Sequence, residues 1–157
     1  MGSLLPSKPS IPAGIYCPTI TFFQPNPTQD IDFDAQSAHA RFLMKAGVHG
    51  ITIHGTTGES VLLSKEERIA VIKAIAAVKK ELKSPTTLVV GCSAESVRET
   101  VKMCKDAKEN GGEYALVLPP SYWVKASTNE MLEAFFTKVF TIPEKRIVNG
   151  NRQRCGS

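Results

Sequence analysis

The pattern that most constrains the fold of this chain is a glycine at the end of a helix-like segment, followed by a short apolar run. Gly47 precedes the apolar residues 51–53, and Gly111 precedes the apolar residues 115–117. The two glycines are 64 residues apart with one full unit between them, so each unit takes about 32 residues. A (β/α)8 barrel of about 250 residues spends about 31 residues on each unit. The spacing therefore predicts successive βα units of a barrel.

The segments between these landmarks alternate between strand and helix patterns. Strands rich in apolar and β-branched residues are predicted at residues 15–23, 51–53, 87–91 and 114–118. Pro18 must lie near an end of the first strand or at a bulge, because proline cannot donate to a sheet. Near-continuous apolar strands in this order are typical of a parallel sheet covered on both sides. An open doubly wound sheet has the same order, but the G-x-G-x-x-G and G-x-x-x-x-G-K fingerprints are missing.

Each helix has start signals and an apolar stripe. The first helix begins at an N-cap, Asp32 or Asp34, and ends at Gly47. Ser64 and Glu67 form a capping box for the second, which runs to about Leu82. Ser93 or Ser96 caps the third. The predicted core-facing residues are Ala38, Phe42 and Ala46, then Ile69, Ile72 and Ala76 with Ile75 and Leu82 beside them, then Val97, Val101 and Cys104. The lysines predicted to be solvated on the second helix are Lys73, Lys79, Lys80 and Lys83.

The charge distribution argues against a nucleic-acid-binding protein. The 157 residues carry a net charge of +4, but four basic residues lie within residues 145–157, which contain no acid. Subtracting these four charges leaves the first 144 residues at zero. The four residues are Lys145, Arg146, Arg152 and Arg154.

Cysteine and histidine spacing predicts neither a metal site nor another cofactor. The four cysteines show no C-x-x-C pair, and the three histidines form no H-E-x-x-H motif. Reduced, mostly buried thiols are therefore expected. No apolar stretch approaches the ~20 residues of a membrane span, and the first residues lack signal-peptide features, which predicts a cytoplasmic location.

A glycine-flanked loop follows the apolar residues 51–53. Gly55 and Gly58 enclose Thr56 and Thr57, so hydroxyl and N–H groups occupy a small space where the backbone can turn sharply. Such groups after a strand bind carboxylate or phosphate. A purely structural turn is the alternative that the local pattern leaves open.

Three stretches carry a family resemblance. They are residues 14–21, the G-T-T-G-E-S core at 55–60 with the L-S-K-E-E-R helix start at 63–68, and the P-P-S-Y-W segment at 119–123. In this order they resemble the dihydrodipicolinate synthase and N-acetylneuraminate lyase family. The resemblance implies an α/β fold: a partial TIM (β/α)8 barrel of about four βα units, with parallel strands and helices outside. It also implies a class I aldolase, in which a lysine forms a Schiff base with pyruvate or another 2-oxo acid.

The resemblance also assigns roles to residues. Thr57 would bind the 2-oxo acid carboxylate, and Thr56 would share that contact and relay protons. Tyr122 would join the proton relay across a subunit interface of a homo-oligomer, although packing over the barrel rim is an alternative. Ser121 stands where the family usually has a second tyrosine.

The later family motifs do not appear in the sequence. The family carries a Y-N-x-P tyrosine on its fifth strand and a G-x-K Schiff-base lysine on its sixth, and residues 141–157 resemble neither. Lys125 and Lys138 are predicted to be solvated, because no motif surrounds them and a lowered lysine pKa needs burial. We therefore expect a flexible lead-in at residues 1–13, a partial aldolase-type barrel at 14–140 and a basic, non-family tail at 141–157, with no Schiff-base lysine.

Three hypotheses about function remain at this point. The first is a pyruvate-type lyase truncated before its lysine. The second is a non-catalytic fragment, an interaction or regulatory chain that pairs with a full-length relative, or an out-of-frame gene product. The third is phosphate binding through the glycine loop of an open sheet. A half barrel has two unpaired strand edges, so association with itself or a partner is expected.

Overall fold

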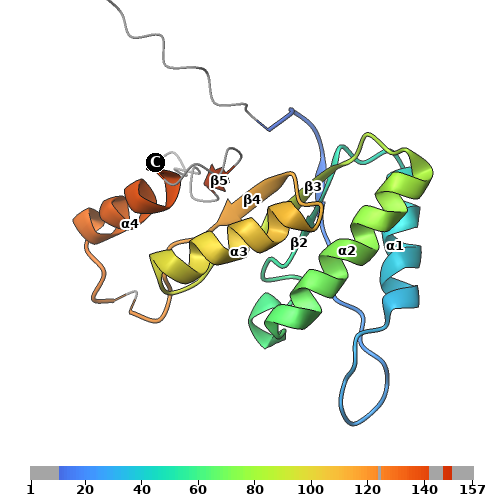
Figure 1. Ribbon diagram of the computed structural model, residues 1–157, viewed down its shortest axis with the longest axis horizontal. Coiled ribbons are helices and arrows are strands. Elements are labelled where there is room, and N and C mark those ends of the chain that lie inside the picture. The colour runs from blue at the N-terminus through green and yellow to red at the C-terminus, as the bar shows by residue number, and fades with distance from the viewer. Residues whose placement is uncertain (1–10, 124, 142–146, 150–157) are drawn as a thin grey trace, which may run out of the picture.

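The computed structural model describes residues 11–123, 125–141 and 147–149 of the chain (Figure 1). Its strands are β1 (Tyr16–Pro18), β2 (Gly50–Ile53), β3 (Thr87–Gly91), β4 (Tyr114–Val117) and β5 (Ile147–Asn149). Its helices are α1 (Phe33–Lys45), α2 (Lys65–Leu82), α3 (Val97–Glu109) and α4 (Asn129–Thr141), with a short 3-10 helix, η1, at Ser60–Leu62.

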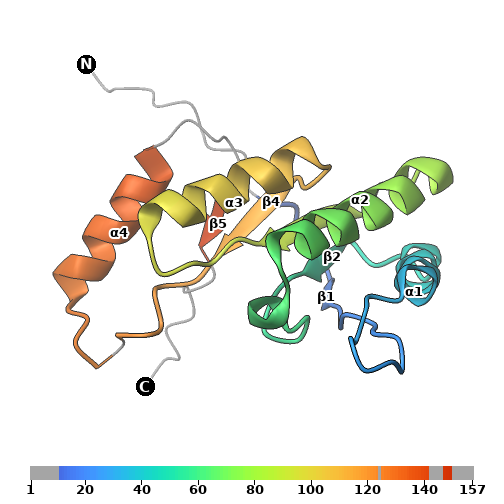
Figure 2. The same cartoon turned by 60° about the horizontal axis from the view of Figure 1, so that its bottom comes forward.

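The five strands form one parallel sheet in the order β1-β2-β3-β4-β5. Each helix contacts the next one along the chain, and Figure 2 shows the helices along the same side of the curved sheet. A doubly wound sheet reverses its strand order at a switch point and places helices on both faces. Among the described strands no reversal occurs, so the arrangement is that of consecutive βα units of a barrel, as predicted.

The core lies between the sheet and the four helices α1–α4. Ile51 and Ile53 of β2, Leu88 and Val90 of β3, and Val117 of β4 are almost completely buried. Buried thiols are confirmed at Cys92 and Cys104, whereas Cys17 is half-buried and Cys155 lies outside the described residues. In the described part of the chain, no helix has the length and apolar character needed to cross a membrane.

The predicted helix starts are confirmed in atomic detail. The Asp32 carboxylate accepts a hydrogen bond from Ala35 N at 2.9 Å and so caps α1. Ser64 and Glu67 form the capping box of α2: Ser64 N donates to Glu67 Oε2 at 2.7 Å, and Glu67 N donates to Ser64 Oγ at 3.2 Å. Of the two serines considered for α3, Ser96 is the cap. These bonds satisfy N–H groups that a helix start otherwise leaves unpaired.

The predicted buried face of α1 is wrong. Ala38, Phe42 and Ala46 are all exposed, and Phe42 stacks on His39 at the surface. The helix instead buries a polar residue, Gln36, together with Ala40, Leu43 and Met44. The Gln36 amide accepts from Phe22 N at 3.2 Å and donates to Ile20 O at 3.5 Å. A hydrophobic pattern cannot identify this face, because its first buried residue is a glutamine. The side-chain amide of that glutamine forms its hydrogen bonds with an irregular segment of the chain.

The predicted stripe of α2 is correct only in part. Ile72 and Ile75 are buried, but Val71 and Val78 complete the buried face, and Ile69, Ala76 and Leu82 are half-buried. One lysine of the predicted solvated face is also misplaced. Lys79 forms an ion pair with Glu113, whose other carboxylate oxygen accepts from Leu88 N at 3.0 Å. This pair joins α2 to the start of β3.

The first strand is shorter than predicted and ends at Pro18. Beyond Pro18 the chain leaves the sheet after one further bond, from Thr19 N to Thr52 O at 3.0 Å. The Thr21 hydroxyl then donates to Gly58 O at 2.7 Å, within a buried contact. The segment predicted as the rest of a strand therefore supports the glycine loop.

Candidate active site

A cavity of about 300 Å³ lies where β2, β3 and β4 end. Its lining comes from the segments that follow three successive strands. The residues include His54, Gly55 and Thr56 after β2, Gly91, Ser93 and Glu95 around the end of β3, and Leu118, Pro119 and Ser121 after β4. The carboxyl ends of strands form the active-site face of (β/α)8 barrels. The predicted glycine loop thus contributes one wall of a cavity at that face.

The backbone of the loop turns at different residues from those predicted. His54 and Glu59 have positive φ angles of 57° and 51°, whereas Gly55 and Gly58 do not lie in the left-handed region. Gly58 instead lies in a tight backbone contact. A Cβ at this position would lie 3.0 Å from Thr19 O and 3.1 Å from His54 N. Gly55 has open space around it.

The tightest approach to the loop comes from a glycine that sequence reasoning missed. A Cβ on Gly91, the last residue of β3, would lie 1.9 Å from the carbonyl oxygen of His54. The absence of a side chain at Gly91 therefore lets the start of the loop pack directly on β3.

The two threonines present free hydrogen-bond donors. Within the loop, Gly58 N donates to Gly55 O and Glu59 N donates to Thr56 O, both at 3.1 Å. None of the described residues accepts a hydrogen bond from the N–H or the hydroxyl of Thr56 or Thr57. Both threonines are exposed; Thr56 lines the cavity, and Thr57 lies next to it in the chain without lining it. Four donors of two adjacent residues are thus available to a ligand.

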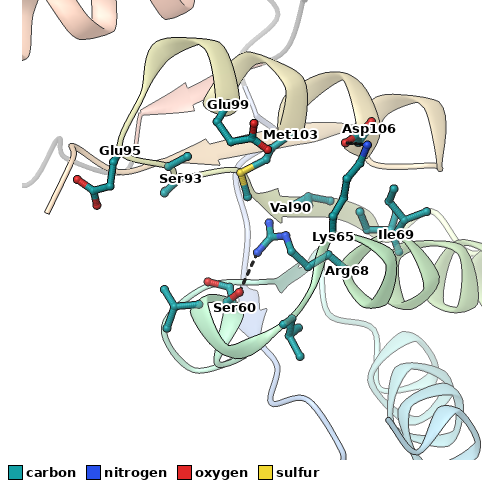
Figure 3. A pocket seen from close by; sticks show the side chains of 14 residues that line it. Ser60, Lys65, Arg68, Ile69, Val90, Ser93, Glu95, Glu99, Met103 and Asp106 are labelled. Carbon is teal, nitrogen blue, oxygen red and sulfur yellow. Dashed lines mark hydrogen bonds and ion pairs between the residues drawn. The ribbon is translucent and has the colours of Figure 1, made fainter. Parts of the chain in front are cut away.

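Arg68 supports the loop from the helix side. Its Nη1 donates to Ser60 O at 3.3 Å (Figure 3). Its Nη2 donates to Gly91 O at 2.5 Å, so the guanidinium ties the end of the loop to the end of β3. Burial lowers the pKa of Arg68 from its ordinary value. Arg68 also borders a second cavity, of about 340 Å³, between α2 and α3, in which Lys65 pairs with Asp106 at 3.3 Å. The arginine of the S-x-E-E-R motif was the sequence signal for this residue.

His54 is buried without a partner. Its side chain is 3% exposed, and neither ring nitrogen has a hydrogen-bond partner among the described residues. Burial, and to a smaller extent the charge of Arg68, lower the pKa of His54 to about 3. The imidazole is therefore neutral near pH 7.

His54 should make the fold sensitive to acid. Because its pKa is about 3 in the folded chain against an ordinary value of 6.5, the unfolded chain binds more protons between these values. Stability then falls as the pH drops from 7 to 5, by about 2 kcal/mol from this group alone. Denaturant unfolding of wild type and His54→Leu should show a shallower pH slope in the variant. Equal slopes for wild type and His54→Leu would contradict the prediction.

Tyr122 does not join the threonines within this chain. It lies between β4 and α4 with its side chain 75% exposed and its ring packed edge-on against Trp123, and it does not line the cavity. Lys125 and Lys138 are exposed, as predicted. Within the described ranges, no three His, Cys, Asp or Glu side chains could together hold a metal ion.

These features define a class of protein: an α/β chain of consecutive barrel units with a donor-rich loop at the carboxyl ends of its strands. Comparison with known families is more specific. The dihydrodipicolinate synthetase family matches residues 12–149. The chain belongs to that family. The match extends past the boundary predicted at residue 140 and includes β5.

Several similar curated proteins carry aldolase names. The chain is 41% identical over 137 residues to an L-threo-3-deoxy-hexylosonate aldolase of Aspergillus niger, covering 86% of this chain and 40% of that protein. It is 40% identical over 134 residues to an Emericella nidulans protein named as a mitochondrial 4-hydroxy-2-oxoglutarate aldolase, covering 85% of this chain and 42% of that protein. The chain thus spans about two-fifths of the length of these relatives.

Solved structures agree with this placement. A dihydrodipicolinate synthase family protein from Coccidioides immitis superposes with a TM-score of 0.76 at 32% identity, over 87% of this chain and 42% of that one. A prophage protein of the family from E. coli K12, solved in complex with pyruvate, gives a TM-score of 0.75 at 25% identity, over 87% of this chain and 43% of that one.

Proposed function

We propose that this chain carries the carboxylate-binding part of the active site of a lyase that acts on pyruvate or another 2-oxo acid. The observation that carries the proposal is the pair Thr56 and Thr57, whose N–H and hydroxyl groups have no partner among the described residues; Thr56 lines the strand-end cavity and Thr57 follows it in the chain. The aldolase names of the relatives and the pyruvate bound to the E. coli protein support the choice of ligand.

The chemistry of a 2-oxo acid suits such a loop. Its carboxylate is adjacent to its ketone, so holding the carboxylate fixes the direction of the carbonyl group. A lysine amine can then attack the carbonyl carbon; the C=N bond of a Schiff base forms, and the oxygen leaves as water. In this proposal Thr57 and Thr56 bind the carboxylate, and the Thr56 hydroxyl also passes protons. We assign no lysine of this chain to the nucleophile.

The remaining assignments are part of the same proposal. Tyr122 acts in the proton relay from a neighbouring subunit of a homo-oligomer, which agrees with its exposure and its absence from the cavity of its own chain. The protein acts in the cytoplasm without a cofactor.

Borohydride trapping tests whether a lysine of this chain forms the Schiff base. The purified chain is incubated with pyruvate and borohydride and its intact mass is measured, with a full-length family member as the positive control. We expect no adduct, because Lys125 and Lys138 are exposed and no motif surrounds them. An adduct on any lysine would overturn this part of the proposal. The alternative of a non-catalytic partner chain also predicts no adduct, but it gives Thr57 no role in binding pyruvate.

A further inference from the structure

The segment that carries Tyr122 is held by the loop that follows the neighbouring strand. Ser121 N and Ser121 Oγ donate to Glu95 Oε1 at 3.2 and 3.1 Å, and Tyr122 N donates to Glu95 Oε2 at 3.1 Å. In the same loop, Ser93 Oγ accepts from Leu118 N at 2.8 Å. Two side chains between β3 and α3 thus receive four hydrogen bonds from the segment after β4.

The carboxylate of Glu95 is the stronger of these two acceptors. Hydrogen bonds to an ionised group are shorter and about twice as strong as bonds between neutral groups. Both oxygens are used, so the two backbone N–H groups are held in a fixed relation to each other. Figure 3 shows Glu95 on the loop ahead of α3, so the residue belongs neither to β3 nor to α3.

Trp123 O accepts hydrogen bonds from Ala126 N at 2.8 Å and Ser127 N at 3.0 Å, which closes a turn on the α4 side of the segment. Among the described residues, however, Ser121 N and Tyr122 N donate only to Glu95. The side chains of Tyr122 and Trp123 are 75% and 67% exposed, and they contact each other edge-on with ring centroids 4.9 Å apart. An exposed pair of rings contributes little burial to fix the backbone beneath it. The position of the Tyr122 backbone therefore depends on the bonds to Glu95.

We infer that Glu95 is a positioning residue that, in its ionised form, holds Tyr122 at the rim of the active site. The inference rests on the proposed function for the role of Tyr122, but the contact itself can be tested without any activity. Glu95 also lines the strand-end cavity through which a ligand would reach Thr56. The residue therefore connects the carboxylate-binding loop and the Tyr122 segment.

The charge of Glu95 gives the contact a pH dependence. Burial raises the pKa of Glu95, but the hydrogen bonds from Tyr122 and Ser121 together outweigh it, so the pKa lies below its ordinary value. The contact is then complete above the ordinary pKa of a glutamate and is lost as the pH falls through the lowered value. The charged or titratable residues that share the two cavities with Glu95 are His54, Glu59, Lys65, Arg68, Glu99 and Asp106.

Trp123 makes the test direct, because it is the only tryptophan in the chain and follows Tyr122. Acrylamide quenching of its fluorescence and hydrogen exchange of the Ser121 and Tyr122 amides are measured in wild type, Glu95→Gln and Glu95→Asp. We expect Glu95→Gln to raise quenching and to speed exchange of the Tyr122 amide roughly tenfold, about the protection given by one hydrogen bond to a charged group. Glu95→Asp should restore part of both signals. In the wild-type chain, acrylamide quenching of Trp123 should rise as the pH falls below the ordinary pKa of glutamate.

Glu99→Gln is the matched control, because it removes the same charge four residues further along and Glu99 has no bond to Ser121 or Tyr122. Unchanged quenching and exchange in Glu95→Gln, or equal changes in Glu99→Gln, would overturn the inference. Titration of the wild-type chain with pyruvate in parallel separates this result from the proposed function. Failure to bind pyruvate would overturn the proposed function. The quenching and exchange data alone decide whether Glu95 holds the Tyr122 segment.

Discussion

Replacing Gly91 with alanine is expected to cost about 3 kcal/mol of unfolding free energy, near the upper end for overpacking a closed site. The new Cβ would lie 1.9 Å from the carbonyl oxygen of His54, and the contacted atom belongs to the backbone, so a side-chain rotation cannot relieve the overlap. The start of the glycine loop must move away from β3. Urea unfolding measures the loss, and pyruvate affinity reports the displacement of Thr56 and Thr57.

Gly55→Ala is the matched control for this change. It adds the same methyl group to the same loop, where no atom lies within 4 Å and the φ angle is not in the left-handed region. Its unfolding free energy should stay within about 0.5 kcal/mol of wild type. Equal stability for the two variants would show that Gly91 and His54 are not packed as described.

Replacing Thr57 with valine is expected to weaken pyruvate binding by about tenfold or more. Valine keeps the β-branched shape of threonine but lacks the hydroxyl, and one hydrogen bond to a charged group contributes about 1.5–3 kcal/mol. Thr57 is exposed and its hydroxyl has no partner among the described residues, so the fold should not be affected. Isothermal titration calorimetry measures the affinity, and thermal unfolding confirms unchanged stability.

Thr137→Val serves as the control for Thr57→Val. Thr137 is exposed on α4 and does not line the strand-end cavity, so the same chemical change should leave the affinity unaltered. Tight pyruvate binding by the Thr57→Val chain would refute the carboxylate role of Thr57. A loss of affinity in both variants would show that the effect does not belong to the loop.

Local sequence signals predicted the elements of the fold well. Strand β3 has the predicted bounds, and the caps at Asp32, Ser64 and Ser96 depend on bonds within a few residues of the chain. Such short-range interactions can be predicted from a sequence. The buried face of α1 could not be predicted in this way. Its Gln36 forms hydrogen bonds with Phe22 and Ile20, which are distant in sequence and belong to no regular element.

The site was predictable only at its most distinctive motif. The G-T-T-G-E-S core located the loop, but the residues that shape and hold it come from other segments. Gly91 lets the backbone of the loop approach β3 closely, and Arg68 donates to two backbone carbonyl groups. Glu95 accepts hydrogen bonds from the Tyr122 segment. Apart from the bond between Arg68 and Ser60, which are 8 positions apart, these contacts join residues 23 to 37 positions apart, which no local pattern encodes. The roles of Thr56, Thr57 and Tyr122 stay predictions.

In the proposed function, this chain binds a 2-oxo acid through the loop between β2 and η1. A titration of the ¹⁵N-labelled chain with pyruvate, followed by backbone amide chemical shifts, tests it most directly. We expect the largest saturable shifts at Thr56 and Thr57, and no such shifts at these residues in the Thr57→Val chain. Saturable shifts confined to other parts of the chain, or no shifts at millimolar pyruvate, would contradict it.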